Sequence, residues 1–224
     1  YTWLWRLDEK GVDRPSRRSR SSRNESGGVT VLPGTYKMVL SRDSLSVDTQ
    51  MVVELDPRLE YDLEGMKEQF VMAKELERMQ QTAADAVKQL SESLGIIEKF
   101  DASMKALDKD KYKDVLDQAK KESEKIENLI ALYIGKVDDR QGITRNPEVS
   151  IVSRMYSAQS YVASRPAGLT TTELQLVDQA KNALNDALNQ TNNYFEKDWA
   201  NYQSLIRELD LSPFKEVSTF QTID

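Results

Sequence analysis

The fold is decided by residues 170–209, TTTELQLVDQAKNALNDALNQTNNYFEKDWANYQSLIREL. The apolar residues of this stretch recur in steps of three, four and seven, which places them on one side of a helix. They are Leu174, Val177, Leu184, Leu188, Phe195, Trp199, Tyr202, Ile206 and Leu209. At about 1.5 Å per residue, such a helix is roughly 58 Å long. A stripe of that length needs antiparallel partner helices, and the preceding chain supplies candidates.

Composition narrows the classes of function. The 224 residues are 39% hydrophobic and 30% charged, with a net charge of −6. The acidic balance argues against nucleic acid as a partner, because phosphate binding needs a concentrated basic face. There is no cysteine and no histidine, which removes disulfides, thiolate nucleophiles and the commonest zinc ligands. No apolar run approaches the roughly 20 residues of a membrane span.

The first residues resemble the middle of a strand. Trp3, Trp5 and Leu7 would share one face of a strand over residues 1–7. That face predicts a sandwich core, and a platform for stacking carbohydrate is the functional alternative. A natural start would carry Met, and no signal peptide is visible. We therefore expect a fragment of a longer protein, with any targeting signal upstream.

Residues 8–30 are predicted to form a polar loop. Its arginines include Arg17, Arg18 and Arg20, set among serines and closed by Gly27 and Gly28. One interpretation is a patch for an anionic ligand. The richness in Ser and Gly favours the other interpretation, a solvated surface loop.

A β-hairpin is predicted next. Pro33 and Gly34 suit a type II turn, and a strand with alternating side chains follows from residue 35 to residue 40. Residues 42–44 resemble a tight turn, and the next strand covers residues 46–55. Its inward set is Val47, Met51, Val53 and Leu55. A pair of strands with bare edges is marginal alone, so we expect it to pair with upstream strands or with a second copy of the chain.

Beyond residues 56–58 the period becomes helical. The first helix begins after Asp62 as N-cap and breaks at residues 109–111, and the second closes at Gly135. The third is predicted from residues 146–147 to about residue 164, and the fourth opens with a capping box at Thr170 and Glu173. These elements predict a mainly α protein: a four-helix up-down-up-down bundle, residues 59–224, after a short antiparallel β segment, residues 1–58. A coiled-coil dimer is the rival architecture.

No catalytic constellation is visible in the sequence. The 37 acidic residues scatter over helix surfaces, and neither a Walker, nor a G-x-S-x-G, nor a dinucleotide pattern occurs. We predict no catalytic residue, no cofactor and no metal. Trp199 and Tyr202 could bind a sugar together with Asn192 and Asn193, although aromatic residues on such a stripe more often belong to the core.

Three motifs resemble a known family. They are residues 3–7 (WLWRL), residues 32–40 (LPGTYKMVL) and residues 56–58 (DPR). This run resembles the region after the β-propeller in large secreted bacterial proteins with sialidase-like (BNR, Asp-box) or sortilin-like repeats, often labelled glycosyl hydrolases. The resemblance implies the later part of an Ig-like domain, a partial sandwich, followed by a helical tail. No Asp-box motif occurs here, so no catalytic residue can be carried over.

Two functions follow as expectations. The first is a non-catalytic C-terminal accessory module, acting as spacer, docking or interaction domain. Its partners would be the upstream β-propeller of the same polypeptide and, as a second option, another copy in a homodimer. The second is a carbohydrate-binding module that uses Trp3, Trp5 or Trp199 to stack on a glycan. The resemblance implies a secreted, periplasmic or cell-surface location.

Overall fold

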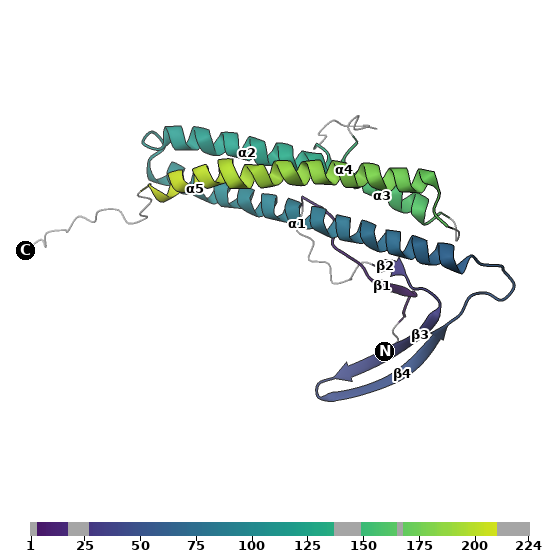
Figure 1. The fold of residues 1–224 in the computed structure, drawn as a ribbon. Coiled ribbons are helices and arrows are strands. Elements are labelled where there is room, and N and C mark those ends of the chain that lie inside the picture. The colour runs from purple at the N-terminus through teal and green to yellow at the C-terminus, as the bar shows by residue number, and fades with distance from the viewer. Residues whose placement is uncertain (1–3, 18–26, 137–148, 165–167, 210–224) are drawn as a thin grey trace, which may run out of the picture.

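The computed structural model describes residues 4–17, 27–136, 149–164 and 168–209. It is mainly helical, with two small antiparallel sheets, which confirms the predicted class (Figure 1). The helices are α1 Leu63–Asp108, α2 Lys113–Ile134, α3 Ile151–Val162, α4 Thr171–Tyr194, the π-helix η1 Phe195–Trp199, and α5 Ala200–Arg207. The last three elements form one uninterrupted helical run. It corresponds to the helix predicted over residues 170–209.

The helix ends follow their capping residues. The Asp62 side chain accepts a hydrogen bond from the Gly65 N–H at 3.0 Å and caps α1. Gly135 closes α2 with a φ of 82°, a backbone conformation that glycine adopts without strain. Thr170 and Glu173 form the predicted capping box, with the Thr170 N–H donating to the carboxylate at 2.8 Å. These three predictions are confirmed.

The start of α3 was predicted too early. The helix begins at Ile151, where the Ser150 hydroxyl accepts from the Ser153 N–H at 3.2 Å. A serine at the N-cap satisfies a free helical N–H as well as the predicted asparagine would. The predicted start at residues 146–147 lies outside the described residues.

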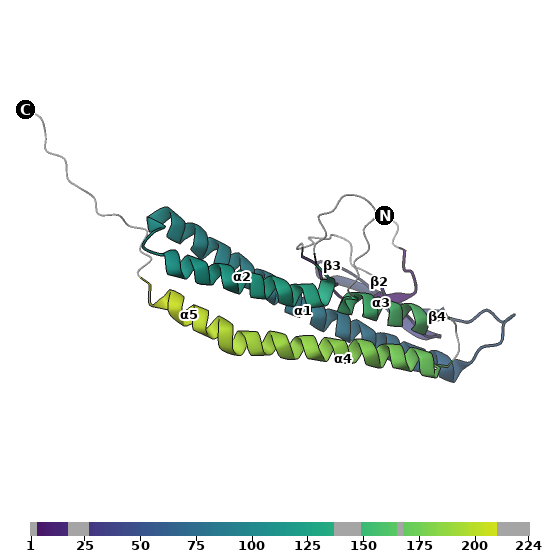
Figure 2. The same cartoon turned by 90° about the horizontal axis from the view of Figure 1, so that it is seen from above.

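The predicted up-down-up-down order is not confirmed. Glu75 of α1 pairs with Lys181 of α4 at 2.8 Å, and Asp62 also accepts from the Gly168 N–H, so α1 and α4 begin at the same end. Both views show α2 and α3 following one another along α1 (Figures 1 and 2). The two short helices thus share one leg antiparallel to α1, because α1, with 46 residues, is long enough to cover both.

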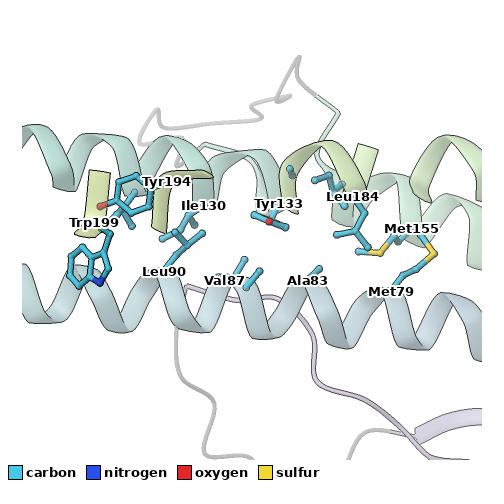
Figure 3. Close-up of a cluster of buried hydrophobic side chains, with 14 of the residues drawn as sticks. Met79, Ala83, Val87, Leu90, Ile130, Tyr133, Met155, Leu184, Tyr194 and Trp199 are labelled. Carbon is cyan, nitrogen blue, oxygen red and sulfur yellow. The ribbon is translucent and has the colours of Figure 1, made fainter. Parts of the chain in front are cut away.

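The core is a single apolar cluster along the helices. Figure 3 shows α1 residues facing side chains of α2, α3 and α4. Val87 and Leu90 of α1 and Ile130 and Tyr133 of α2 are fully buried. The Tyr133 hydroxyl lies 2.8 Å from the Thr191 hydroxyl, which satisfies two polar groups inside this core.

The strands form two separate pairs. β1 Asp8–Lys10 pairs with β2 Gly27–Thr30, and β3 Gly34–Arg42 pairs with β4 Leu45–Val53, both antiparallel. The predicted loop over residues 8–30 is therefore wrong at its two ends. Both strands are short, with three and four residues, and neither has the alternation of apolar and polar side chains that marks a half-buried strand. The partial Ig-like sandwich is not confirmed by these two-stranded pairs.

Two local predictions in the β segment are wrong. Residues 4–7 are not a strand, because Leu7 adopts a φ of 60° and turns the chain before β1. Gly34 opens β3 and does not take the positive φ of a type II turn; among the described glycines only Gly135 has one. The hairpin turn is confirmed, with Asp43 at a φ of 53°.

The close contact between the starts of α1 and α4 can be tested with two glycine-to-alanine variants in the same helix. A Cβ added at Gly65 would lie 2.2 Å from the Gly168 nitrogen, whereas one added at Gly95 of the same helix meets nothing within 4 Å. We expect Gly65→Ala to lower the free energy of unfolding by about 1–3 kcal/mol through overpacking. Gly95→Ala should raise it by about 0.5–1 kcal/mol, because alanine is the better helix former. Urea unfolding of both variants measures this, and equal effects would contradict the close approach.

Candidate functional site

The predicted aromatic residues lie at separate places. Trp199 is 9% exposed and Tyr202 is 3% exposed, so both belong to the core. Trp5 is half-buried: its ring packs edge-on against Tyr36, with centroids 5.5 Å apart, and its indole N–H donates to the Asp8 carbonyl at 2.7 Å. Trp3 lies outside the described residues. The structure does not bring these rings together into one stacking platform.

The predicted arginine patch is represented by Arg17 alone, because Arg18 and Arg20 lie outside the described residues. The Arg17 guanidinium forms an ion pair with Glu127 of α2 and donates to the Gly135 carbonyl at 3.0 Å. A cation at the C-terminal end of a helix also interacts favourably with its dipole. Arg17 is therefore engaged by the protein itself.

The segment before Arg17 lies along the helices as a strap, which we define as residues 8–17. The Asp13 N–H donates to the Gln81 side chain of α1 at 3.0 Å, and the Arg14 guanidinium lies 5.4 Å from the ring centroid of Tyr156 in α3. The strap thus contacts α1, α2 and α3. It fixes the N-terminal segment of the chain to the helices.

Ion pairs continue this attachment at β1. Lys74 of α1 lies 2.6 Å from the buried Glu77 and 2.7 Å from Glu9 of β1. Glu77 first and then Glu9 raise the pKa of the Lys74 ammonium, since both stabilise its charge. Gly28 of β2 approaches Glu77 so closely that an added Cβ would lie 2.9 Å from its carboxylate oxygen. The small sheet is packed directly on α1.

The β3–β4 hairpin has one apolar face. In the observed register, even-numbered residues of β3 lie opposite odd-numbered residues of β4 on the same face. We call the apolar members of this set the hairpin face: Tyr36, Met38, Leu40, Leu45, Val47, Met51 and Val53; Arg42 and Thr49 lie on the same side. The other face carries mostly polar residues, including the ion pair between Lys37 and Asp48 at 3.2 Å.

The hairpin face is covered only near its base. Tyr36, Met38, Met51 and Val53 are half-buried, and Trp5 packs on Tyr36. Towards the turn, Leu40, Leu45 and Val47 are 71%, 75% and 66% exposed. The predicted inward set is thus correct for Met51 and Val53 and wrong for Val47. The hairpin extends away from the helices, and no described helix packs along it (Figure 1).

A second unusual place is η1, the π-turn. The buried residues of the C-terminal helical run are Glu173, Val177, Ala180, Leu184, Ala187, Thr191, Tyr194, Trp199, Tyr202 and Ile206. Their steps are three or four, except for the step of five from Tyr194 to Trp199. A π-turn inserts one residue into a helix and is frequent at functional sites. The sequence analysis did not predict the π-turn, because the buried stripe includes the polar Thr191, which a search for apolar residues passes over. The signal that could have revealed it is the five-residue step between Tyr194 and Trp199.

Beside the π-turn lie three buried polar side chains and an ion pair that reaches the surface, which together we call the π-turn cluster: the buried Glu122, Tyr194 and Tyr202, and the pair Lys125 and Asp198. Glu122 of α2 is 1% exposed. Its Oε1 accepts from Gln118 at 2.7 Å and from Lys125 at 2.9 Å, and Lys125 also pairs with Asp198 of η1. The salt bridges therefore connect α2 to η1. They also raise the pKa of the Lys125 ammonium, with Asp198 as the larger cause and Glu122 as the smaller.

The two tyrosines of the cluster are held in their neutral form. Burial raises the pKa of Tyr194 far above its ordinary value, and the negative charge of Glu122 adds to this. Burial likewise raises the pKa of Tyr202 to about 12, with smaller contributions from Asp101 and Glu122. Neutral phenols beside a carboxylate can donate hydrogen bonds at ordinary pH.

A groove with a volume of about 620 Å³ lies between α1 and the start of α2. Its lining includes four lysines and four acids, so it presents no net charge to a ligand. Within the described ranges, no group of three or more acidic side chains is placed to hold a metal ion. None of the helices in those ranges is long and apolar enough to cross a membrane.

Comparison of the chain with family models, curated proteins and solved structures finds no match. The function must therefore be inferred from the hairpin face, the strap and the π-turn cluster.

The π-turn cluster predicts instability at alkaline pH. In the unfolded chain a tyrosine ionises near pH 10, whereas folded Tyr202 keeps its proton to about pH 12. Above pH 10 the unfolded state releases a proton that the folded state retains, so the free energy of unfolding falls by about 1.4 kcal/mol per pH unit for each such tyrosine. Below pH 10 this contribution is fully present and does not vary.

Urea unfolding between pH 8 and pH 12 measures the effect. Lysine ion pairs also weaken in this range, so the informative quantity is the difference between the wild type and Tyr202→Phe. We expect the free energy of unfolding of the variant to fall less steeply with pH, because the variant lacks the Tyr202 hydroxyl, whose pKa is raised in the folded state. Identical slopes would show that Tyr202 ionises as freely in the folded state as in the unfolded state.

Proposed function

We propose that this chain is a non-catalytic accessory module of a larger polypeptide, which docks through its β segment and extends away from the docking site through its helices. The observation that carries the proposal is the hairpin face, an amphipathic two-stranded sheet whose apolar side is covered only at its base. Exposed apolar surface on an unpaired hairpin favours association. The helices have their own buried core and need no partner to complete it.

The size of the hairpin face favours an occupant from the same polypeptide. Nine residues per strand give a length of about 30 Å, and two strands with side chains give a width of about 10 Å. One face therefore offers about 300 Å², whereas a stable interface between separate chains needs about 800 Å² per partner. A tethered partner overcomes this deficit through its high effective concentration. A second copy of the chain, meeting this face alone, would not.

Continuity with an existing contact favours one kind of occupant for the hairpin face. Trp5, from the segment before β1, already packs on Tyr36 at the base of the hairpin face. Further β structure preceding this segment would extend the same cover towards Leu40 and Val47. Sheets pack face to face about 10 Å apart with interdigitating apolar side chains. The finer form of the proposal is an Ig-like sandwich that β3 and β4 complete, next to an upstream β-propeller.

The strap and α1 support a role of the module as a stiff spacer. Contacts from the strap to three helices, together with the Lys74 ion pairs, join the N-terminal segment and the helices into a single unit. The 46 residues of α1 span about 68 Å. The module would act as a stiff spacer that presents its far end to a partner. A secreted, periplasmic or cell-surface location is included in the proposal, through the resemblance to propeller proteins.

Carbohydrate binding is less well supported. Trp199 and Tyr202 are buried, and a glycan would have to open the core to reach them. Trp5 offers one partly covered ring, whose edge-on packing on Tyr36 leaves little of a stacking platform.

The test begins with the intact mass of the protein from its native source. The proposal expects a species several-fold heavier than 25.6 kDa. Hydrogen exchange then compares that polypeptide with the 224-residue chain, and β3 and β4 should exchange more slowly in the longer protein. Equal exchange would exclude docking of the hairpin face, and a native mass of 25.6 kDa would exclude a tethered partner.

A matched pair of variants identifies the docking side. The double variant Leu40→Ser with Val47→Ser removes apolar surface from the hairpin face, whereas Val39→Ser changes the opposite face, where Val39 is similarly exposed. In the native polypeptide the double variant should restore fast exchange in the hairpin, and Val39→Ser should not. The same result from both would mean that docking does not depend on this face.

A further inference from the structure

The π-turn cluster contains three buried polar atoms without a hydrogen-bond partner among the described residues. They are Oε2 of Glu122 and the hydroxyl oxygens of Tyr194 and Tyr202. Each side chain is more than nine-tenths buried. An unpartnered polar atom in a protein interior costs about 1–3 kcal/mol, and native proteins rarely leave several together.

The three atoms come from different elements that pack on one another beside the π-turn. Tyr194 is the residue before η1, Tyr202 lies in α5, and Glu122 lies in α2. After burial, the charge of Glu122 is the next cause that raises the pKa of Tyr194, and a hydrogen-bond contribution from the same carboxylate adds to it; Tyr202 experiences the charge alone. Its Oε1 is already occupied by Gln118 and Lys125, which leaves Oε2 for the tyrosines.

The chemistry of these groups is complementary to one small ligand. A carboxylate oxygen only accepts, and two neutral phenols can both donate. Water has two lone pairs and two hydrogens, so one molecule can accept from both tyrosines and donate to Glu122. We propose that Glu122, Tyr194 and Tyr202 form an internal binding site for one ordered water molecule, which joins α2, α4 and α5 across the π-turn.

Two other arrangements fit the observations less well. A direct bond from Tyr194 to Glu122 would satisfy those two atoms and leave the Tyr202 hydroxyl buried without a partner. A cation would be disfavoured, because Lys125 already neutralises the carboxylate at 2.9 Å. Buried waters typically make about three hydrogen bonds to such groups, which matches the number of unpartnered atoms.

A crystal structure of the chain at high resolution is the first test. The expected result is one ordered water within about 2.6–3.2 Å of all three oxygens. Direct contact between the Tyr194 hydroxyl and Glu122, with no water between the three groups, would overturn the proposal.

Phenylalanine variants provide a second test, in solution. If a water joins the hydroxyls, Tyr194→Phe and Tyr202→Phe should each increase the unfolding equilibrium constant by roughly fivefold. The double variant should show less than the product, because both act on one water. Tyr161→Phe, at a half-exposed position, is the control and should change nothing. An unchanged or smaller constant in Tyr202→Phe would overturn the proposal, since removal of an unsatisfied hydroxyl is neutral or stabilising.

Discussion

The structure depends on keeping one stripe of the C-terminal helical run against the other helices along its whole length, with α1 and α3 beside its first part and α2 beside its last part. An α-helix has 3.6 residues per turn, so alternating steps of three and four drift slowly around its axis. The stripe from Val177 to Tyr194 follows such steps, and the π-turn adds one residue before Trp199. The extra residue returns Trp199, Tyr202 and Ile206 to the buried side. Without the extra residue, Trp199 and Tyr202 would be rotated towards solvent, and a cavity would remain at the end of the core beside α2.

The direction of the helices follows from the same constraint. α1 and α4 begin together at Asp62 and Gly168, so they run in parallel, and the chain that returns from the end of α1 to the start of α4 runs in the opposite direction. α2 and α3 form this returning chain in succession. The sequence predicted four helices from caps and periodicity, and caps are local. It could not predict their order, since connection length alone does not tell whether the chain turns back or continues after residue 135.

Particular residues show where prediction from sequence succeeds. Asp62, Gly135 and the pair Thr170 and Glu173 act within one helical turn, so their side-chain chemistry decides the structure there. β1 and β2 were missed because their pairing depends on packing against α1 through Lys74, Glu77 and Gly28, which are distant in sequence. Of the predicted site residues, Trp199 and Tyr202 were assigned to the stripe correctly, yet their burial removes them from any surface site. Arg17 was predicted as a free cation or a ligand contact, and Glu127 and Gly135 engage it instead.

Most of the described chain buries apolar side chains and pairs its buried polar groups. Two places depart from this pattern, one by exposing apolar side chains and the other by burying unpaired polar atoms. The hairpin face exposes apolar side chains that folding would normally bury, and the π-turn cluster buries polar atoms that folding would normally pair. Such local conflicts lower stability and persist where something compensates for them. For the hairpin, the compensation we propose is a docked partner outside the described residues, because none of the described residues covers Leu40 or Val47. For the cluster it must come from a group small enough to be enclosed among α2, α4 and α5. Residues 54–62 join the hairpin to the start of α1, whereas the cluster lies beside the second half of α1, so the two departures occupy separate places along one long helix.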